Sequence, residues 1–190
     1  MRPVTLVMCF LALLVLVVPG YARTAYSGTV VHEPSTYPAN VRNAARAARL
    51  VNCQVIFPGQ VFSFNAAVGP RTVANGFIPR KAMINGKFVY ADVGSGICRT
   101  ASALYQAALG AKLPIVEHHS HSYRVEYTLA ETDTAIWWDT MDLKIRNDCS
   151  FPLLIRATTA SSGVTVTLKE EHTDLFRLEQ RLLHYRSSLM

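Results

Sequence analysis

Three segments of the chain are predicted to be helical, two in its middle and one near its end. In 97–111 the apolar residues Ile97, Ala101, Leu104 and Ala108 recur at a spacing that places them on one face of a helix. The alanine and arginine content of 41–50 favours a second helix, for which Asn40 is the candidate N-cap. Segment 173–186 carries an amphipathic pattern and predicts a third helix.

Short apolar runs bounded by turn residues predict the strands. The clearest is 164–168, where apolar and polar residues alternate as in a half-buried strand. Asn85-Gly86 predicts a hairpin between 82–84 and 87–90, because a type I′ turn needs positive φ at both central residues. The other candidate strands are 55–57, 61–64, 115–116, 123–127, 135–138, 141–145 and 153–157. The whole pattern predicts an α+β fold, with two or three helices beside a mostly antiparallel sheet.

The length of 190 residues is that of one domain with short extensions. Arg2, an apolar run over 4–18 and small residues ending at Ala22 are typical of a secretory signal peptide. An uncleaved signal would instead anchor the protein in a membrane. The expected organisation is a signal peptide at 1–22, a linker at 23–39, a folded domain at 40–171 and a C-terminal helix or tail at 172–190.

The formal net charge of +6 restricts the partners of such a protein. Outside a bacterial cell, the partners of opposite charge are anionic cell-wall polymers and lipid head groups. The basic residues are scattered and no nucleic-acid-binding motif is present, so no nucleic acid partner is expected.

Three cysteines, Cys53, Cys98 and Cys149, follow the predicted signal peptide. Export favours disulfide formation. The odd count leaves at least one thiol free or paired between molecules.

Cys98 is the candidate nucleophile. It follows Gly94-Ser95-Gly96 and opens the predicted helix, where N–H groups and the helix dipole favour a thiolate and lower a thiol pKa. The same N–H groups can bind the oxyanion formed by attack on a carbonyl, and the glycines can leave room for a substrate backbone. A small core residue or half of a disulfide would explain the same position.

The run Glu117-His118-His119-Ser120-His121 supplies candidate bases. On a strand, His119 and His121 would point to one face and His118 to the other. Either of the first two could take the thiol proton and return a proton to a leaving amine. Two alternatives are a surface histidine cluster and a metal site with Cys98, His119 and His121 as ligands.

Asp133, Asp139 and Asp142 are candidates to orient the base. Asp142 is preferred, because it lies in a predicted apolar strand where a carboxylate needs a partner. Arg71, in a Gly-Pro-Arg-Thr turn, could hold a substrate carboxylate as a bidentate fork or be an exposed turn residue. Trp137 and Trp138 could line a groove, although one of them is more often core.

Three blocks containing these residues resemble the VanW family. They are Pro58-Gly59-Gln60-Val61-Phe62-Ser63-Phe64-Asn65 with Val68-Gly69-Pro70-Arg71-Thr72; Gly94-Ser95-Gly96-Ile97-Cys98 with Ser102, Leu104 and Tyr105; and Glu117, His119, His121 and Ser122 with Asp142 and Asn147. Their order and spacing match as well, and the second and third blocks are specific in combination. The resemblance implies that 40–171 is a VanW-like domain.

The resemblance also implies a chemistry. The family is named from glycopeptide-resistance gene clusters, and some members resemble cysteine L,D-transpeptidases that cross-link peptidoglycan stem peptides. Cys98 is then the nucleophile of an acyl transfer, His119 or His121 the base, and no cofactor is expected. Transfer to water would make the protein a carboxypeptidase.

The chain departs from the family pattern beside the nucleophile. Ser95 stands where a glycine is usual, and Arg99 stands where glutamine is usual. If that glutamine contributes to an oxyanion hole, Arg99 must replace it. The candidate substrate-binding residues are Arg71, Gly94, Gly96, Arg99 and Ser102.

Cys53 and Cys149 occupy positions that are not typically cysteine in the family. The hypothesis for an exported chain is that they form a disulfide and leave Cys98 free.

Three functions remain open. The protein is a cysteine acyl-transferase, a non-catalytic wall-binding or assembly protein, which Arg99 favours, or a metal-binding protein that uses the histidine cluster. The first two place it outside the cytoplasm, whether secreted, periplasmic or associated with the cell wall.

Overall fold

The computed structural model describes residues 25–32, 36–84 and 87–171. The predicted signal peptide, the C-terminal helix and the Asn-Gly turn lie outside these residues. In the part of the chain that is described, no helix is long and apolar enough to cross a membrane.

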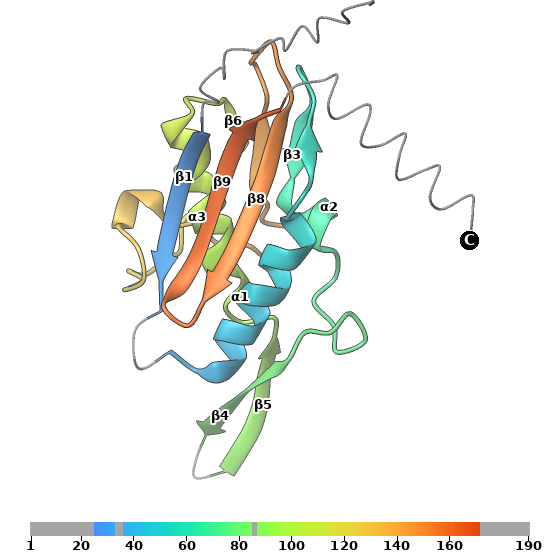
Figure 1. Cartoon of the computed structure of the whole chain (residues 1–190). Coiled ribbons are helices and arrows are strands. Elements are labelled where there is room, and N and C mark those ends of the chain that lie inside the picture. The colour runs from blue at the N-terminus through green and yellow to red at the C-terminus, as the bar shows by residue number, and fades with distance from the viewer. Residues whose placement is uncertain (1–24, 33–35, 85–86, 172–190) are drawn as a thin grey trace, which may run out of the picture.

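A four-stranded antiparallel sheet forms the centre of the fold (Figure 1). Its strand order is β1 (Ala25–Val31), β9 (Gly163–Glu170), β8 (Leu153–Ala160) and β2 (Val55–Ile56). Helix α3 (Ile97–Gly110) packs against β1 and β9, and α1 (Pro38–Val51) packs against β8 and α3. The predicted α+β class, with a mostly antiparallel sheet, is confirmed.

Two smaller sheets complete the described structure. One has the order β3 (Val61–Ser63), β7 (Lys144–Arg146) and β6 (Ile115–Glu117), and the short helix α2 (Phe64–Val68) follows β3. The other is the hairpin of β4 (Pro79–Ile84) and β5 (Lys87–Val93), which extends away from the central sheet in Figure 1. Ile84 pairs with Lys87, so the predicted hairpin is confirmed. A single 3-10 turn, Ala130–Thr132, lies between β6 and β7.

A fully buried asparagine joins the central sheet to the β3–β7–β6 sheet. Asn147 exchanges backbone hydrogen bonds with the turn after β2, at Gly59 and Gln60. Its side-chain amide donates to the carbonyl oxygens of Ile56 and Phe151, at 2.8 and 2.9 Å. Because these acceptors flank strands of the central sheet, one side chain fixes how the two sheets meet.

The start of α3 is fixed by its contact with α1. Asn43, which is fully buried, donates to the carbonyl oxygens of Ile78 and Ser95 and accepts a bond from the Ile78 N–H. Thr100 on α3 donates to the carbonyl of Ala44 on α1 at 2.9 Å. These bonds hold the turn before α3, and therefore Cys98, in one place.

The segment predicted as a linker contains a strand. β1 pairs with β9 over its whole length, and Val30 is completely buried. The polar residues that suggested a linker face outward, where Ser27 and Thr29 pair through their hydroxyl groups with Thr167 and Thr165. Cross-strand hydroxyl pairs of this kind stabilise a sheet, and their partners lie too far along the chain to be read locally.

Other local predictions also needed correction. Pro38 begins α1 and Tyr37 is its N-cap, so Asn40 lies within the helix. Segments 123–127 and 135–138 are loops, with only an isolated bridge between Trp137 and Met141. Their aromatic and β-branched residues suggested strands, but these side chains line a cavity instead of pairing in a sheet.

We expect Gly28→Ala to destabilise the fold, because β1 lies against the backbone of α3. A Cβ at Gly28 would lie 2.1 Å from the carbonyl oxygen of Ala103. Overpacking against a rigid backbone costs about 1–3 kcal/mol of unfolding free energy, measurable by chemical denaturation. Gly110→Ala is the matched control, because its Cβ would meet only Tyr26 at 3.9 Å. Equal stability of the two variants would contradict the packing of β1 on α3.

Candidate active site

A cavity of about 840 Å³ opens at the N-terminal end of α3. Its walls come from the turn at 70–72, the segment 93–99, and the loops 120–127 and 135–141. Cys98, His121 and Arg71 all line it. The structure therefore brings together residues from three parts of the sequence that the family resemblance connected.

Cys98 is the second residue of α3 and is half-buried in the cavity wall. Its Sγ lies 3.9 Å from the carbonyl oxygen of Ile136. Two neighbouring N–H groups are used within the helix start, since Ile97 donates to Gly94 and Arg99 donates to Gly96. The predicted position at a helix N-terminus is confirmed, but these two amides already have acceptors and do not form a vacant oxyanion site.

The glycines before Cys98 make room for the protein itself. Both have positive φ, near 102° and 103°. A Cβ at Gly94 would lie 2.7 Å from the side chain of Arg71, and a Cβ at Gly96 would lie 2.3 Å from the backbone of Asn40. Both residues border the cavity, but the space that their missing side chains leave is filled by Arg71 and α1, not reserved for a substrate backbone.

His121 is the histidine that reaches the cavity. Its Nδ1 lies 2.9 Å from Oδ2 of Asp133, and its backbone N–H donates to the same oxygen at 2.8 Å. Asp133 is 4% exposed. A carboxylate bound to Nδ1 favours the tautomer with its proton on that nitrogen, which leaves Nε2 as the basic atom.

The loop that carries Asp133 is anchored from both sides. Ser102 on α3 accepts a hydrogen bond from the backbone N–H of Thr134 at 2.9 Å. His118 bonds through Nε2 to the carbonyl oxygen of Asp133 at 2.8 Å and stacks on Tyr105. Ser102 is fully buried. Ser102 therefore positions the loop and lies outside the cavity lining, whereas the sequence had suggested that it binds substrate.

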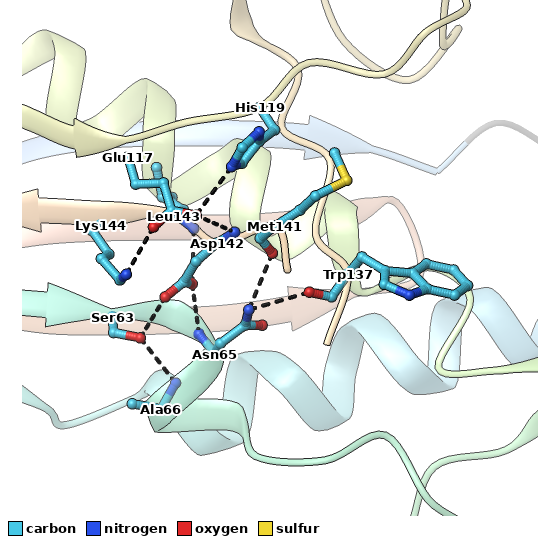
Figure 2. A network of polar contacts seen from close by, with 10 residues as sticks. All are labelled: Ser63, Asn65, Ala66, Glu117, His119, Trp137, Met141, Asp142, Leu143 and Lys144. Atoms are coloured by element: carbon cyan, nitrogen blue, oxygen red, sulfur yellow. Dashed lines mark hydrogen bonds and ion pairs between the residues drawn. The ribbon is translucent and has the colours of Figure 1, made fainter. Parts of the chain in front are cut away.

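His119 and Asp142 belong to a separate network, shown in Figure 2. His119 Nε2 lies 3.0 Å from a carboxylate oxygen of Glu117, which also forms an ion pair with Lys144. Asp142 accepts hydrogen bonds from the hydroxyl of Ser63 and from the backbone N–H groups of Asn65 and Leu143. None of these bonds to the Asp142 carboxylate comes from a histidine, whereas Asp133 binds the cavity histidine.

Arg99 is buried, and its side chain joins separate parts of the fold. Its guanidinium donates to the carbonyl oxygen of Val31 at 2.8 Å and to the hydroxyl of Thr36 at 3.3 Å. It also lies over the ring of Tyr127, 4.3 Å from the centroid. Burial, followed by the charge on Cys98, raises the pKa of Tyr127, so this phenol stays neutral beside the cavity. Arg99 thus ties the end of β1 to the cavity wall.

The two tryptophans are both exposed at the cavity, Trp137 at 60% and Trp138 at 40%. They form a wall of the groove, and neither is a core residue. Arg71 lies over the Trp138 ring at 5.3 Å.

Among the described residues, Cys53 and Cys149 do not form the disulfide that the sequence suggested. Cys53 accepts a hydrogen bond from Arg156 at 3.0 Å. Burial raises the pKa of Cys149, which packs against the core. The arrangement does not favour the metal-site alternative either, because His119 joins Glu117. No group of three or more His, Cys, Asp or Glu side chains within the described ranges is placed to hold a metal ion.

Two residues contribute more to this site than the sequence suggested. Asp133 was a candidate, but the apolar surroundings of Asp142 made the latter the preferred one. Asn65 was only part of a family block, yet its side chain accepts a bond from Arg71 and donates to the carbonyl oxygens of Trp137 and Met141. No local signal distinguishes these residues, because their partners lie in other loops.

The Glu117 network predicts a pH dependence of stability. Hydrogen bonds from Lys144, and then from His119, lower the pKa of Glu117 from 4.5 to about 2. The folded state therefore favours the carboxylate, and this stabilisation is complete above about pH 4.5 and lost as the pH falls toward about 2. The difference in unfolding free energy between the wild type and Glu117→Gln should shrink over that range, in denaturation series at several pH values. Glu126→Gln, at an exposed glutamate, is the control. A constant difference for Glu117→Gln across the range would contradict the network.

The family match with known proteins spans the residues gathered here. The family described as VanW like protein matches residues 39–169. The chain is 32% identical over 139 residues to the uncharacterized protein YoaR of Bacillus subtilis (strain 168). That match covers 73% of this chain and 46% of YoaR, so the chain spans less than half the length of this relative. No solved structure matches. The chain belongs to the family of VanW-like proteins.

Proposed function

We propose that this protein is an exported cysteine acyl-transferase that acts on peptidoglycan stem peptides, as an L,D-transpeptidase. One observation carries the proposal: Cys98 and the Asp133-bound His121 line the same cavity. A thiol, a base and a carboxylate that orients the base are the parts that nucleophilic catalysis needs. The substrate class and the extracytoplasmic location come from the family resemblance and the signal-like N-terminal sequence.

The chemistry follows from these roles. His121 Nε2 takes the thiol proton, and the sulfur of Cys98 attacks the carbonyl carbon of a stem-peptide bond. An S–C bond forms, the C–N bond breaks, and the imidazolium returns its proton to the departing amine. A neighbouring stem amine then attacks the thioester, forms an amide bond and releases the thiol. Water as the acceptor would give a trimmed peptide, the outcome of a carboxypeptidase.

Asp133 acts through His121 in this scheme. Its buried carboxylate keeps the Nδ1 proton in place and stabilises the imidazolium that forms during attack. The partly buried Arg71 adds positive charge on the cavity wall, where charge develops on the sulfur and on the carbonyl oxygen. The chain's net positive charge suits a protein that works among anionic wall polymers.

Arg99 gives specific support to a second function, binding of wall peptides without chemistry. It stands where the family usually has glutamine, and its guanidinium is bound to Val31 and Thr36. If the family's glutamine stabilises the oxyanion, this chain lacks that donor. The two functions differ in whether a covalent adduct forms.

Incubation with a purified stem tetrapeptide should give a thioester on Cys98. Intact mass should rise by the mass of the donor minus the mass of the released terminal amino acid, and Cys98→Ser should show no such thioester mass under the same conditions. Cys53→Ser should acylate normally, since Cys53 lies outside the cavity. A folded wild-type protein that binds the peptide but gives neither adduct nor product would favour the binding function.

The two candidate histidines should behave differently in the same assay. His121→Gln removes the base and should slow acylation by about 10²–10⁴-fold. His119→Gln changes the partly exposed network with Glu117, outside the cavity lining, so the acylation rate should stay within about threefold of the wild type. The reverse order of effects would assign the base to His119 and overturn this part of the proposal.

A further inference from the structure

We propose that Arg71 binds the C-terminal carboxylate of the acyl donor, so that the protein selects peptides whose departing residue carries a free carboxylate. This inference rests on the proposed function and names the substrate feature that the cavity recognises. Three observations on the Arg71 guanidinium carry it: its position in the cavity wall, the groups that hold it in place, and the lack of an ion pair with a carboxylate among the described residues.

Arg71 is a cation held by neutral acceptors. It donates to the carbonyl oxygen of Gly69 and to the side-chain oxygen of Asn65. Among the described residues it forms no ion pair with a carboxylate, whereas Lys144 and Arg146 pair with Glu117 and Asp148. A partly buried cation without a close counter-ion is costly, and an anion arriving in the cavity would offset that cost.

The charges around Arg71 point the same way. Burial lowers the pKa of Arg71, and the charges on Cys98 and Asp142 act against that effect. Asp142 is already bound by Ser63, Asn65 and Leu143. Arg71 and Cys98 line the same cavity, so an anion bound to Arg71 would lie close to the bond that Cys98 attacks.

The guanidinium is held in advance of binding. Gly94 has no side chain where the aliphatic part of Arg71 passes, and the ring of Trp138 lies under its charged end. Asn65 is fixed in turn by its bonds to the carbonyl oxygens of Trp137 and Met141 (Figure 2). A group ordered by its neighbours loses little entropy when it binds a ligand.

The hydrogen bonds left on Arg71 suit a carboxylate. Each terminal nitrogen has two N–H groups and gives one to Gly69 or Asn65. The Nε group is buried and has no partner. A planar cation with donors remaining on adjacent nitrogens matches the two oxygens of a carboxylate better than a single carbonyl oxygen.

The test compares one stem tetrapeptide with the same peptide carrying a C-terminal amide. Binding is measured by calorimetry on Cys98→Ser, which separates recognition from chemistry. The acid should bind about 10- to 100-fold more tightly than the amide, as expected for a charge-assisted pair. In the double variant with Arg71→Gln the two peptides should bind alike. Arg71→Lys, which keeps the charge and loses the fork, should keep part of the preference.

Arg80→Gln is the matched control, because Arg80 also lines the cavity but lies over the ring of Tyr37. It should keep the preference for the acid. Equal binding of acid and amide by Cys98→Ser, or no binding of either, would overturn the inference, and so would a preference that survives Arg71→Gln. If Arg71→Gln fails to fold, the inference is still tested by comparing the binding of the acid and the amide to Cys98→Ser, with and without Arg71→Lys.

The outcomes also separate this inference from the proposed function. If Cys98→Ser prefers the acid but the wild type never forms an adduct, the role of Arg71 is supported and the transferase function is contradicted. If the acid and the amide acylate the wild type at equal rates, the transferase function is supported and the role of Arg71 is contradicted.

Discussion

The close approach of α1 and α3 is the constraint on which the rest of the site depends. Gly96 allows it, since a Cβ there would lie 2.3 Å from the backbone of Asn40. Buried polar groups then fix it, because Asn43 binds the carbonyl of Ser95 and Thr100 binds the carbonyl of Ala44. A buried amide or hydroxyl without its partner would be costly, so each bond permits only one placement of the helices. The position of Cys98 follows from that placement.

Two buried aspartates hold different parts of the structure around the cavity. Asp133 binds His121, which lines the cavity. Asp142 accepts two backbone N–H groups and a hydroxyl, which fixes the start of α2 beside β7. Asn65 lies between this anchor and the cavity, where it holds Arg71 and the loop of the tryptophans. Asn65 and Asp142 in Figure 2 thus support the cavity wall from behind and do not line the cavity themselves.

Helices α1 and α3, the hairpin and strands β8 and β9 could be predicted from the sequence, because each has its own local signal. Helical or alternating periodicity does not depend on distant partners. The position of Cys98 at the start of a helix was predictable for the same reason, since Gly94, Gly96 and the helix that follows are local features. Strand β1 was not, because its exposed polar residues are explained only by pairing with residues about 140 positions away, such as Ser27 with Thr167.

By itself, the sequence determined the fold class, the family and the set of residues from which the site is built. The tertiary structure decided which of them meet. Alternation along a strand would have put His119 and His121 on one face, but β6 ends at Glu117 and the loop turns the two histidines to different partners. Likewise, burial alone could not choose between Asp133 and Asp142. Hydrogen bonds join groups across loops, and only the packing of those loops brings donor and acceptor within reach.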